Sequence, residues 1–453
     1  TLLKGGTVVS GSGSQVCDVL IDGEKIERVA AQITCPEANV VDVTGKLLFP
    51  GFIDAHTHFD LDVCNTTTAD NFDTGTHSAI RGGTTMVIDF ACPNKGESLQ
   101  YGLDLWHKKA DGRSSCDYSF HMTIDDWNDE IKAEVPKMFE QGISSFKMYM
   151  TYPAMMIGDK DLFYALEEIK KYGGIAGVHC ENAGVIDALI EQHKADGKLA
   201  PGSHPECRPN ATEAEAVAHL LRICEVADTP VVIVHLSTKE ALAEVMAARA
   251  RGQKVYVETC PHYLTLDGSG YYEADFRKAA GYICAPPLRT KDDQNALWKG
   301  LYNGAIQTVS TDHCSFTLEQ KEAGRGDFTK IPGGLPGVET RGVLLYTFGV
   351  AAGKITKEKM AEVLSENPAK LYGAWPRKGA ILAGSDADIV VYDPDTDTTV
   401  CAADMISAAE YTPYEGMRTS GSIAQVYLRG QLAVDHGEVR TGAIGTFIPR
   451  KTG

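Results

Sequence analysis

The chain has 453 residues, of which 43% are hydrophobic and 23% are charged. These proportions are ordinary for a globular protein and exclude a disordered, collagen-like or coiled-coil chain. The formal net charge is -18 and there is no run of lysine or arginine, so neither a nucleic acid nor an anionic membrane is an expected partner, since both bind through a cationic patch.

Both ends of the chain predict short strands joined by turns. The apolar or alternating runs are residues 7–9, 18–21, 25–30, 388–392, 423–428 and 431–434. The Asp22-Gly23 pair lies between two of these runs, and this is a strong hairpin signal. We therefore expect one small β-sandwich domain built from non-adjacent segments, residues 1–50 plus 375–453.

Between the two ends, short apolar runs alternate with amphipathic segments. Eight runs predict strands, at residues 51–56, 84–90, 116–121, 144–148, 175–179, 230–235, 254–259 and 307–311. The clearest helical segments are residues 99–110, 129–141, 159–172, 212–227, 238–251 and 291–303. Strands that alternate with helices form a parallel sheet, and eight such units are typical of a (β/α)8 TIM-like barrel. The sequence therefore predicts an α/β fold with a catalytic barrel over residues 51–374.

Metal-ligating side chains stand where several of these strands end. His56 and His58 are two residues apart, so both imidazoles point to the same side of a strand. The fifth, sixth and eighth runs end at His179, His235 and Asp312. Strand ends meet at one face of a barrel, so these five side chains predict a metal site. Imidazole and carboxylate ligands suit Zn2+, with Mn2+ and Fe2+ as alternatives.

Lys147 lies at the end of the fourth run, beside this predicted site. A lysine at a strand end ordinarily extends its amine toward water. An ammonium group at a metal site would repel the cation, so spacing alone leaves the role of Lys147 open.

Nine short segments form a pattern that extends over nearly the whole chain. They are GFIDAHTH at 51–58, SFKMYMTY at 145–152, HCEN at 179–182, VHLS at 234–237, ETCPHYL at 258–264, PPLR at 286–289, TDHC at 311–314, LPGVE at 335–339 and YTPYEG at 411–416. In this order they resemble the dihydropyrimidinase and D-hydantoinase family of the amidohydrolase superfamily. The loop after His58 is more similar to the phenylhydantoinase-like members.

The resemblance implies a binuclear centre in which Lys147 is carbamylated by CO2. One ion, expected to be Zn2+ with Mn2+ as the alternative, would be held by His56, His58, Lys147 and Asp312. The second would be held by Lys147, His179 and His235. A hydroxide would bridge the two ions.

The resemblance also implies the reaction. Such enzymes, usually homotetramers, hydrolyse the ring amide of hydantoins or dihydropyrimidines to N-carbamoyl amino acids. Asp312 would act as general base and then as acid, and Tyr152 would stabilise the oxyanion. Tyr152 and backbone groups at Ala285 and Gly333 would bind the ring. Ala285 and Gly333 replace the usual Ser and Asn, which leaves only main-chain contacts there.

Two alternatives remain. An allantoinase or dihydroorotase would keep the same site and change the ring, and dihydroorotate would need a cation in the pocket, for which Arg289 is the evident loop candidate. A non-catalytic assembly protein would have lost ligands, whereas all six positions are intact here.

The remaining candidates are expected to be structural. The 12 scattered cysteines include no CxxC pair, and the start has no signal-peptide layout, so reduced thiols in a cytoplasmic protein are expected. Asp89 and His121 are expected to be structural or to support ligands, and His262 and His313 to orient ligands or loops. The histidines expected on the surface or on helices are His77, His107, His193, His204, His219 and His436.

Overall fold

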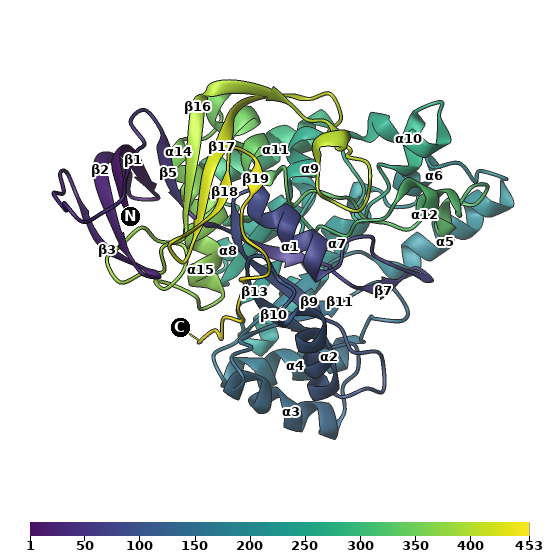
Figure 1. Ribbon diagram of the computed structural model, residues 1–453. Coiled ribbons are helices and arrows are strands. Elements are labelled where there is room, and N and C mark those ends of the chain that lie inside the picture. Colours follow the sequence, from purple (N-terminus) through teal and green to yellow (C-terminus); the bar gives the residue numbers. More distant parts are fainter. Residues whose placement is uncertain (453) are drawn as a thin grey trace.

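The computed structural model describes residues 1–452, and at its centre eight parallel strands form a nearly closed barrel (Figure 1). The barrel strands are β6 Phe52–Thr57, β9 Thr84–Ala91, β10 Asp117–Thr123, β11 Ser145–Tyr149, β12 Ile175–His179, β13 Val231–Ile233, β14 Val255–Thr259 and β15 Thr308–Val309. Each predicted run overlaps one of these strands in the predicted order. The α/β barrel is therefore confirmed.

The longer helices follow the barrel strands in the chain. They are α1 Phe72–Arg81, α2 Leu99–Ala110, α3 Asp129–Glu140, α4 Asp159–Lys171, α5 Ala183–Ala195, α7 Asn210–Ala227, α8 Lys239–Ala250 and α11 Lys291–Tyr302. Polar side chains fix where many of them begin: Ser98 accepts from the Tyr101 N–H before α2, and Asn128 accepts from the Ile131 N–H before α3. The six predicted helical segments match α2, α3, α4, α7, α8 and α11 to within about two residues.

Shorter helical turns connect these units. They are α6 Ser203–Glu206, α9 Pro261–Thr265, α10 Phe276–Ala280, α12 Leu318–Glu322, α13 Arg341–Leu345, α14 Lys357–Ala361, α15 Asn367–Leu371, η1 Gly268–Tyr272, η2 Phe328–Lys330, η3 Tyr346–Ala351, η4 Glu362–Glu366 and η5 Ala402–Asp404. Within residues 1–452, no helix has both the length and the apolar character that crossing a membrane requires.

Side chains close the barrel between its first and last strands. β6 and β15 do not pair with each other, and a backbone bridge joins Thr57 of β6 to His313, four residues after β15. The buried Asp54 carboxylate accepts from the Thr311 N–H at 3.0 Å and from the Thr311 hydroxyl at 2.6 Å. The buried Arg341 guanidinium donates to the Ile53 and Val309 carbonyls at 2.7 and 3.0 Å. These bonds replace a strand ladder, since buried backbone groups must find partners.

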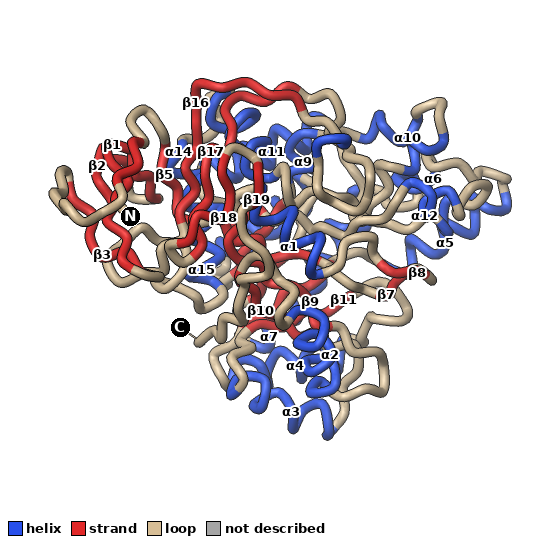
Figure 2. The backbone as a smooth tube through the Cα atoms, in the orientation of Figure 1, coloured by secondary structure: helices blue, strands red, loops and turns tan. Residues whose placement is uncertain are grey.

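Strands from both chain ends form one nine-stranded sheet beside the barrel. They are β1 Leu2–Ser10, β2 Gly13–Asp22, β3 Lys25–Ala30, β4 Val40–Asp42, β5 Leu47–Pro50, β16 Ile389–Thr399, β17 Arg418–Leu428, β18 Gln431–Asp435 and β19 Glu438–Val439. β5 pairs with β1 on one side and β16 on the other, so it joins the two ends (Figure 2). The domain boundaries proposed from the sequence stay a prediction.

A buried ionic cluster links the chain ends to the barrel. Asp117, Asp386 and Asp388 lie close enough together to hold a metal ion. However, the Lys378 amine lies 2.5, 2.9 and 2.7 Å from their carboxylates, and Arg429 also pairs with Asp117. The lysine therefore occupies the position that a cation would take, and the cluster is a structural one.

Candidate metal centre

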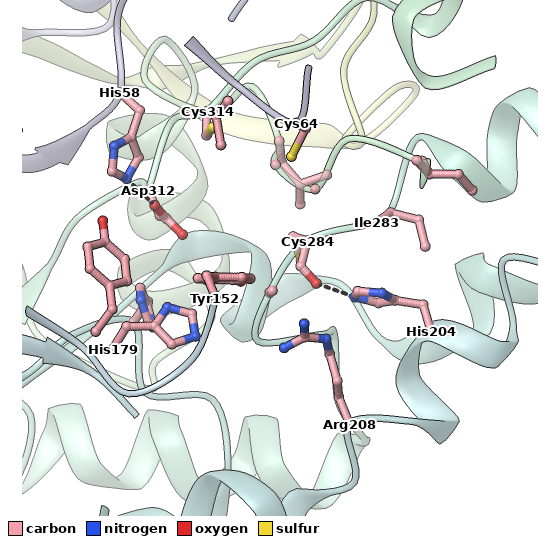
Figure 3. Close-up of a pocket in the computed structure, with 18 of the residues that line it drawn as sticks. His58, Cys64, Tyr152, His179, His204, Arg208, Ile283, Cys284, Asp312 and Cys314 are labelled. Atoms are coloured by element: carbon pink, nitrogen blue, oxygen red, sulfur yellow. Dashed lines mark hydrogen bonds and ion pairs between the residues drawn. The ribbon is translucent and has the colours of Figure 1, made fainter. Parts of the chain in front are cut away.

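The predicted metal ligands meet at the carboxyl-terminal end of the barrel, around a cavity of about 410 Å³ (Figure 3). The cavity is lined by His56, His58, Lys147, His179, His235 and Asp312. These residues come from five different strands or the loops directly after them. The structure thus brings together all six positions that the sequence singled out.

His56, His58 and Asp312 make the tightest group. Their ligand atoms lie within 4.8 Å of one another. The Nε2 atoms of His56 and His58 are 3.0 and 3.1 Å from the same carboxylate oxygen, Oδ1 of Asp312. The imidazoles lower the pKa of Asp312 well below its usual range, although burial acts in the opposite direction.

His56 lies between two carboxylates at this point. Its Nδ1 is 2.7 Å from the buried Glu258 carboxylate, and its Nε2 faces Asp312 Oδ1 at 3.0 Å without a well-aligned hydrogen bond. Burial lowers the pKa of His56, but the charges of Asp312 and Glu258 outweigh it and raise the pKa above its ordinary value. A divalent cation bound between Nε2 and Oδ1 would take the place of a proton there.

The neighbouring imidazoles fit a metal as well. Nδ1 of His58 and Nδ1 of His235 are also buried without hydrogen-bond partners. Burial lowers the pKa of His58 to about 4, so this ring is neutral and has a lone pair to donate. Unpaired buried nitrogen atoms are rare in folded proteins, and several in one cavity are expected where a metal ion binds.

Lys147 is almost fully buried among these rings. Its amine lies 5.0 Å from the ring centres of both Phe90 and Tyr149. Within residues 1–452, no carboxylate lies within 4.0 Å of it. Burial lowers the pKa of Lys147 to about 8, although the charges of Asp312 and Glu258 oppose this shift.

Two buried glutamates orient the imidazoles, and the sequence did not identify either. Glu258, on β14, accepts from the His56 ring and from the His235 backbone N–H at 3.3 Å. Glu181 accepts at 2.7 Å from both His179 Nε2–H and the Arg208 guanidinium. Both glutamates lie inside the motifs quoted above. Glu181 follows His179 by two residues and Glu258 stands near the end of a predicted strand, and these positions were the available signals. Arg208 lies in no such motif.

Replacing Glu258 with glutamine is expected to weaken metal binding about 10- to 100-fold, the usual effect of losing a carboxylate that supports a ligating histidine. A neutral amide no longer holds the proton on His56 Nδ1 as firmly, so the Nε2 lone pair is less available. Competition titration with a chelator measures the change. Glu244→Gln, an exposed substitution on α8, is the control, and equal affinity in both variants would contradict the role of Glu258.

Several site residues have strained backbones. Tyr152, His235 and Asp312 have φ angles of 67°, 39° and 51°, in the left-handed region. Each such residue costs about 1–3 kcal/mol, and such residues cluster at functional sites. The Tyr152 ring lies 5.2 Å from the His179 ring and 5.7 Å from the Arg208 guanidinium carbon.

The proposed ring-binding segments lie on the same cavity. Ala285 and Gly333 both line it. A Cβ added at Gly333 would meet no atom within 4 Å, so packing does not require glycine there.

His204 was expected on the surface or on a helix. It lies on α6 and is buried, and its Nε2–H donates to the Cys284 carbonyl at 2.7 Å.

Asp89 and His121 were expected to be structural or to support ligands, and His262 to orient ligands or loops. Asp89 accepts from Thr57 and from the Phe59 N–H, so it holds the backbone on either side of His58. His121 is buried, with its ring nitrogens bonded to Ala55 and Ser145. His262 lines the cavity, and its Nε2 has no hydrogen-bond partner.

The remaining polar candidates are held by local bonds. His313 donates from Nε2 to Asp70 at 2.9 Å, which fixes the loop after Asp312. Arg289 donates to Glu213 at 3.1 Å and to Ser237 at 3.0 Å, and it does not line the cavity. All 12 cysteines are free thiols, and most are buried.

Comparison with known proteins gives full-length matches. A sequence model described as "Amidohydrolase family" matches residues 47–433. The chain is 42% identical to a D-hydantoinase of Streptomyces coelicolor over 461 residues, covering 100% of this chain and 98% of the relative. It is 39% identical to a D-phenylhydantoinase of Escherichia coli, covering 99% and 98%. The crystal structure of a dihydropyrimidinase from Brevibacillus agri superimposes with a TM-score of 0.98 at 40% identity, covering 100% and 99%.

Proposed function

Since this chain belongs to the amidohydrolase family, we propose that it is a metal-dependent cyclic amidase that opens the ring amide of hydantoins or dihydropyrimidines to N-carbamoyl amino acids. The observation that carries the proposal is the convergence of His56, His58 and Asp312, whose ligand atoms lie within 4.8 Å of one another at the cavity. Three imidazole nitrogens there, on His56, His58 and His235, are buried without hydrogen-bond partners. A divalent metal would supply the missing partner, and a divalent metal beside a cavity is the chemistry of this family.

The ligand sets that we propose follow the residues that line the cavity. His56, His58 and Asp312 would hold one ion, His179 and His235 the other, and Lys147 would bridge both as a CO2-derived carbamate. Carbamylation would convert the buried amine, which would repel a metal ion, into an anion with oxygen atoms that could bind one. Zn2+ is the expected metal, and when bound such ions acidify water and polarise an amide carbonyl.

Residues of the chain would supply proton transfer, oxyanion stabilisation and ring binding. Asp312 would take a proton from the attacking water on its carboxylate and return it to the ring nitrogen as the C–N bond breaks. The Tyr152 hydroxyl would donate to the oxygen that gains charge. Backbone groups at Ala285 and Gly333 would bind the ring. The apolar walls, which include Leu61 and Phe328, would receive the ring substituent.

An allantoinase or dihydroorotase is the second candidate, and the cavity offers one feature in its favour. Arg208 lines the cavity and is the cation that an acidic ring would need. Its guanidinium is already paired with Glu181 at 2.7 Å, however, and Arg289 is engaged elsewhere. These pairings disfavour dihydroorotate, whose carboxylate would need a free cation. Allantoin carries no charge, so turnover distinguishes it from the other hydantoins.

A hydrolysis panel at defined metal loading tests the proposed function. Hydantoin, 5-phenylhydantoin and dihydrouracil are expected to be opened faster than allantoin or dihydroorotate, and a chelator is expected to abolish turnover until Zn2+ is returned. Faster turnover of allantoin or dihydroorotate than of the other hydantoins would favour the allantoinase or dihydroorotase function over the proposed one. Purified protein without bound transition metal would favour the non-catalytic alternative.

The homotetramer implied by the family resemblance also belongs to this proposal. Light scattering of the purified protein measures the assembly mass directly, and a monomeric mass at micromolar concentration would contradict it.

A further inference from the structure

A second buried lysine lies beside the cavity, on the short helix α12 that follows the Asp312 loop. Lys321 is fully buried, and its amine donates to the Ile283 carbonyl at 3.2 Å and to the Pro332 carbonyl at 2.8 Å. Within residues 1–452, no carboxylate lies within 4.0 Å of this amine. Burial lowers the pKa of Lys321 to about 8. A buried amine of this kind costs free energy, so its contacts call for an explanation.

The two carbonyls belong to the two segments that carry Ala285 and Gly333. Ile283 lies two residues before Ala285, and Pro332 lies directly before Gly333. The Ile283 carbonyl also accepts from the Gly334 N–H at 2.9 Å, so the two segments touch at this point. Lys321 does not itself line the cavity, and it joins the two proposed ring-binding segments through these carbonyls.

The neighbouring residue holds a third segment of the cavity wall. Gln320 donates to the Thr66 hydroxyl and to the Thr67 carbonyl, both at 2.8 Å. These residues form β8 Thr66–Thr67, which pairs with β7 Asp62–Val63. Val63 and Cys64 of this hairpin line the cavity, and Figure 3 shows Cys64 at its edge. Consecutive side chains of α12 thus hold three separate parts of the cavity.

The end of α12 also packs closely on one of these segments. A Cβ added at Gly324 would lie 2.5 Å from the Ile331 backbone nitrogen and 2.7 Å from its Cα. Backbone atoms cannot move aside as a flexible side chain can, so the glycine permits this close approach. The position of the 331–334 segment is therefore set at two points, through Lys321 of α12 and through Gly324 in the turn after it.

We propose that Lys321 is a positioning residue that sets the separation of the two ring-binding segments, and so determines whether the cavity accepts a five- or a six-membered ring. The inference rests on the proposed function, because it concerns the substrate of that same site. Removing the ammonium would leave the Pro332 carbonyl without this donor, and the segments would relax to a new spacing. The 331–335 segment also bonds to the loop after Asp312, where the Cys314 N–H donates to the Leu335 carbonyl at 3.2 Å. This second attachment is independent of Lys321, so we expect the proposed metal ligands to stay in place.

Steady-state kinetics of the metal-loaded Lys321→Met enzyme, with hydantoin and dihydrouracil as the two rings, tests the proposal. The ratio of kcat/KM for the two rings is expected to change at least about fivefold, mainly through KM, with metal content and the kcat for hydantoin close to wild type. Lys321→Arg, which keeps a cationic donor, is expected to restore most of the wild-type ratio. Lys330→Met, an exposed substitution on η2, is the matched control.

Hydrogen–deuterium exchange of the holoenzyme separates this proposal from the proposed function. Residues 281–286 and 331–335 are expected to exchange faster in Lys321→Met and not in Lys330→Met. Unchanged exchange, or a ring ratio within about twofold of wild type in folded, metal-loaded enzyme, would overturn the role of Lys321. A wild-type enzyme that opens neither ring would instead refute the proposed function, and exchange would still decide the positioning role. Should Lys321→Met not fold, Lys321→Gln, which has a shorter donor, is expected to shift the ratio in the same direction.

Discussion

Replacing Lys147 with alanine is expected to remove both the metal and the activity. The proposed bridge is the one ligand shared by both ions, so its loss weakens two sites at once. We expect kcat/KM to fall by more than about 1000-fold, because metal-assisted catalysis supplies most of the rate enhancement. Elemental analysis of the purified variant and a hydantoin hydrolysis assay measure the two effects.

Partial rescue distinguishes a missing carbamate from a damaged fold. The alanine leaves a buried gap between the rings of Phe90 and Tyr149, where the lysine amine now lies. A short carboxylic acid such as acetate or propionate can enter this gap and supply two oxygen ligands. Activity that rises with acid concentration, together with regained metal, is the expected outcome. Lys160→Ala, an exposed substitution on α4, should behave as wild type. Undiminished activity in Lys147→Ala would remove the bridging role.

Changing Asp312 to asparagine is expected to lower kcat by about 100- to 10,000-fold, the range that a general acid–base group contributes. The amide has almost the same shape, but it cannot take the proton of the attacking water. Asparagine also tolerates the left-handed backbone at this position, where φ is 51°, so the loop should keep its conformation. The measurement is kcat on hydantoin, with circular dichroism to verify the fold.

Asp312 is also a proposed metal ligand, so the metal content of the Asp312→Asn enzyme must be measured together with its turnover. A variant that keeps at least one ion and still loses kcat points to proton transfer, whereas restored turnover at saturating Zn2+ points to ligation alone. Asp292→Asn, an exposed substitution on α11, controls for the loss of one negative charge. A kcat within about threefold of wild type would show that Asp312 is not the base.

The sequence predicted most of the barrel because its strands and longer helices have local patterns. The apolar runs that became β9 and β14, and the amphipathic segment that became α4, each contain their own signal within about ten residues. The short helix α12 has no such signal, because five residues are too few to show a helical period. The helix α5 was also not predicted; its pattern is weak because only Ile186 within it is buried.

The proposed metal ligands could be predicted for a related reason. A strand end can be read from the sequence, and the barrel topology then places all strand ends at one face. The strand ends by themselves therefore predicted that five side chains meet, and the family resemblance added Lys147 as the sixth ligand.

The tertiary structure alone decided what surrounds them. Glu258 bonds to His56 across 202 residues of chain, and Lys321 reaches Ile283 across 38. Arg208 meets Glu181 only because α6 and the loop after β12 face the same cavity. Such contacts depend on how separate loops pack over the barrel mouth, and no local pattern encodes that packing. They set the imidazole protonation and the spacing of the ring-binding segments, since hydrogen-bond direction and distance exist only after the loops have come together.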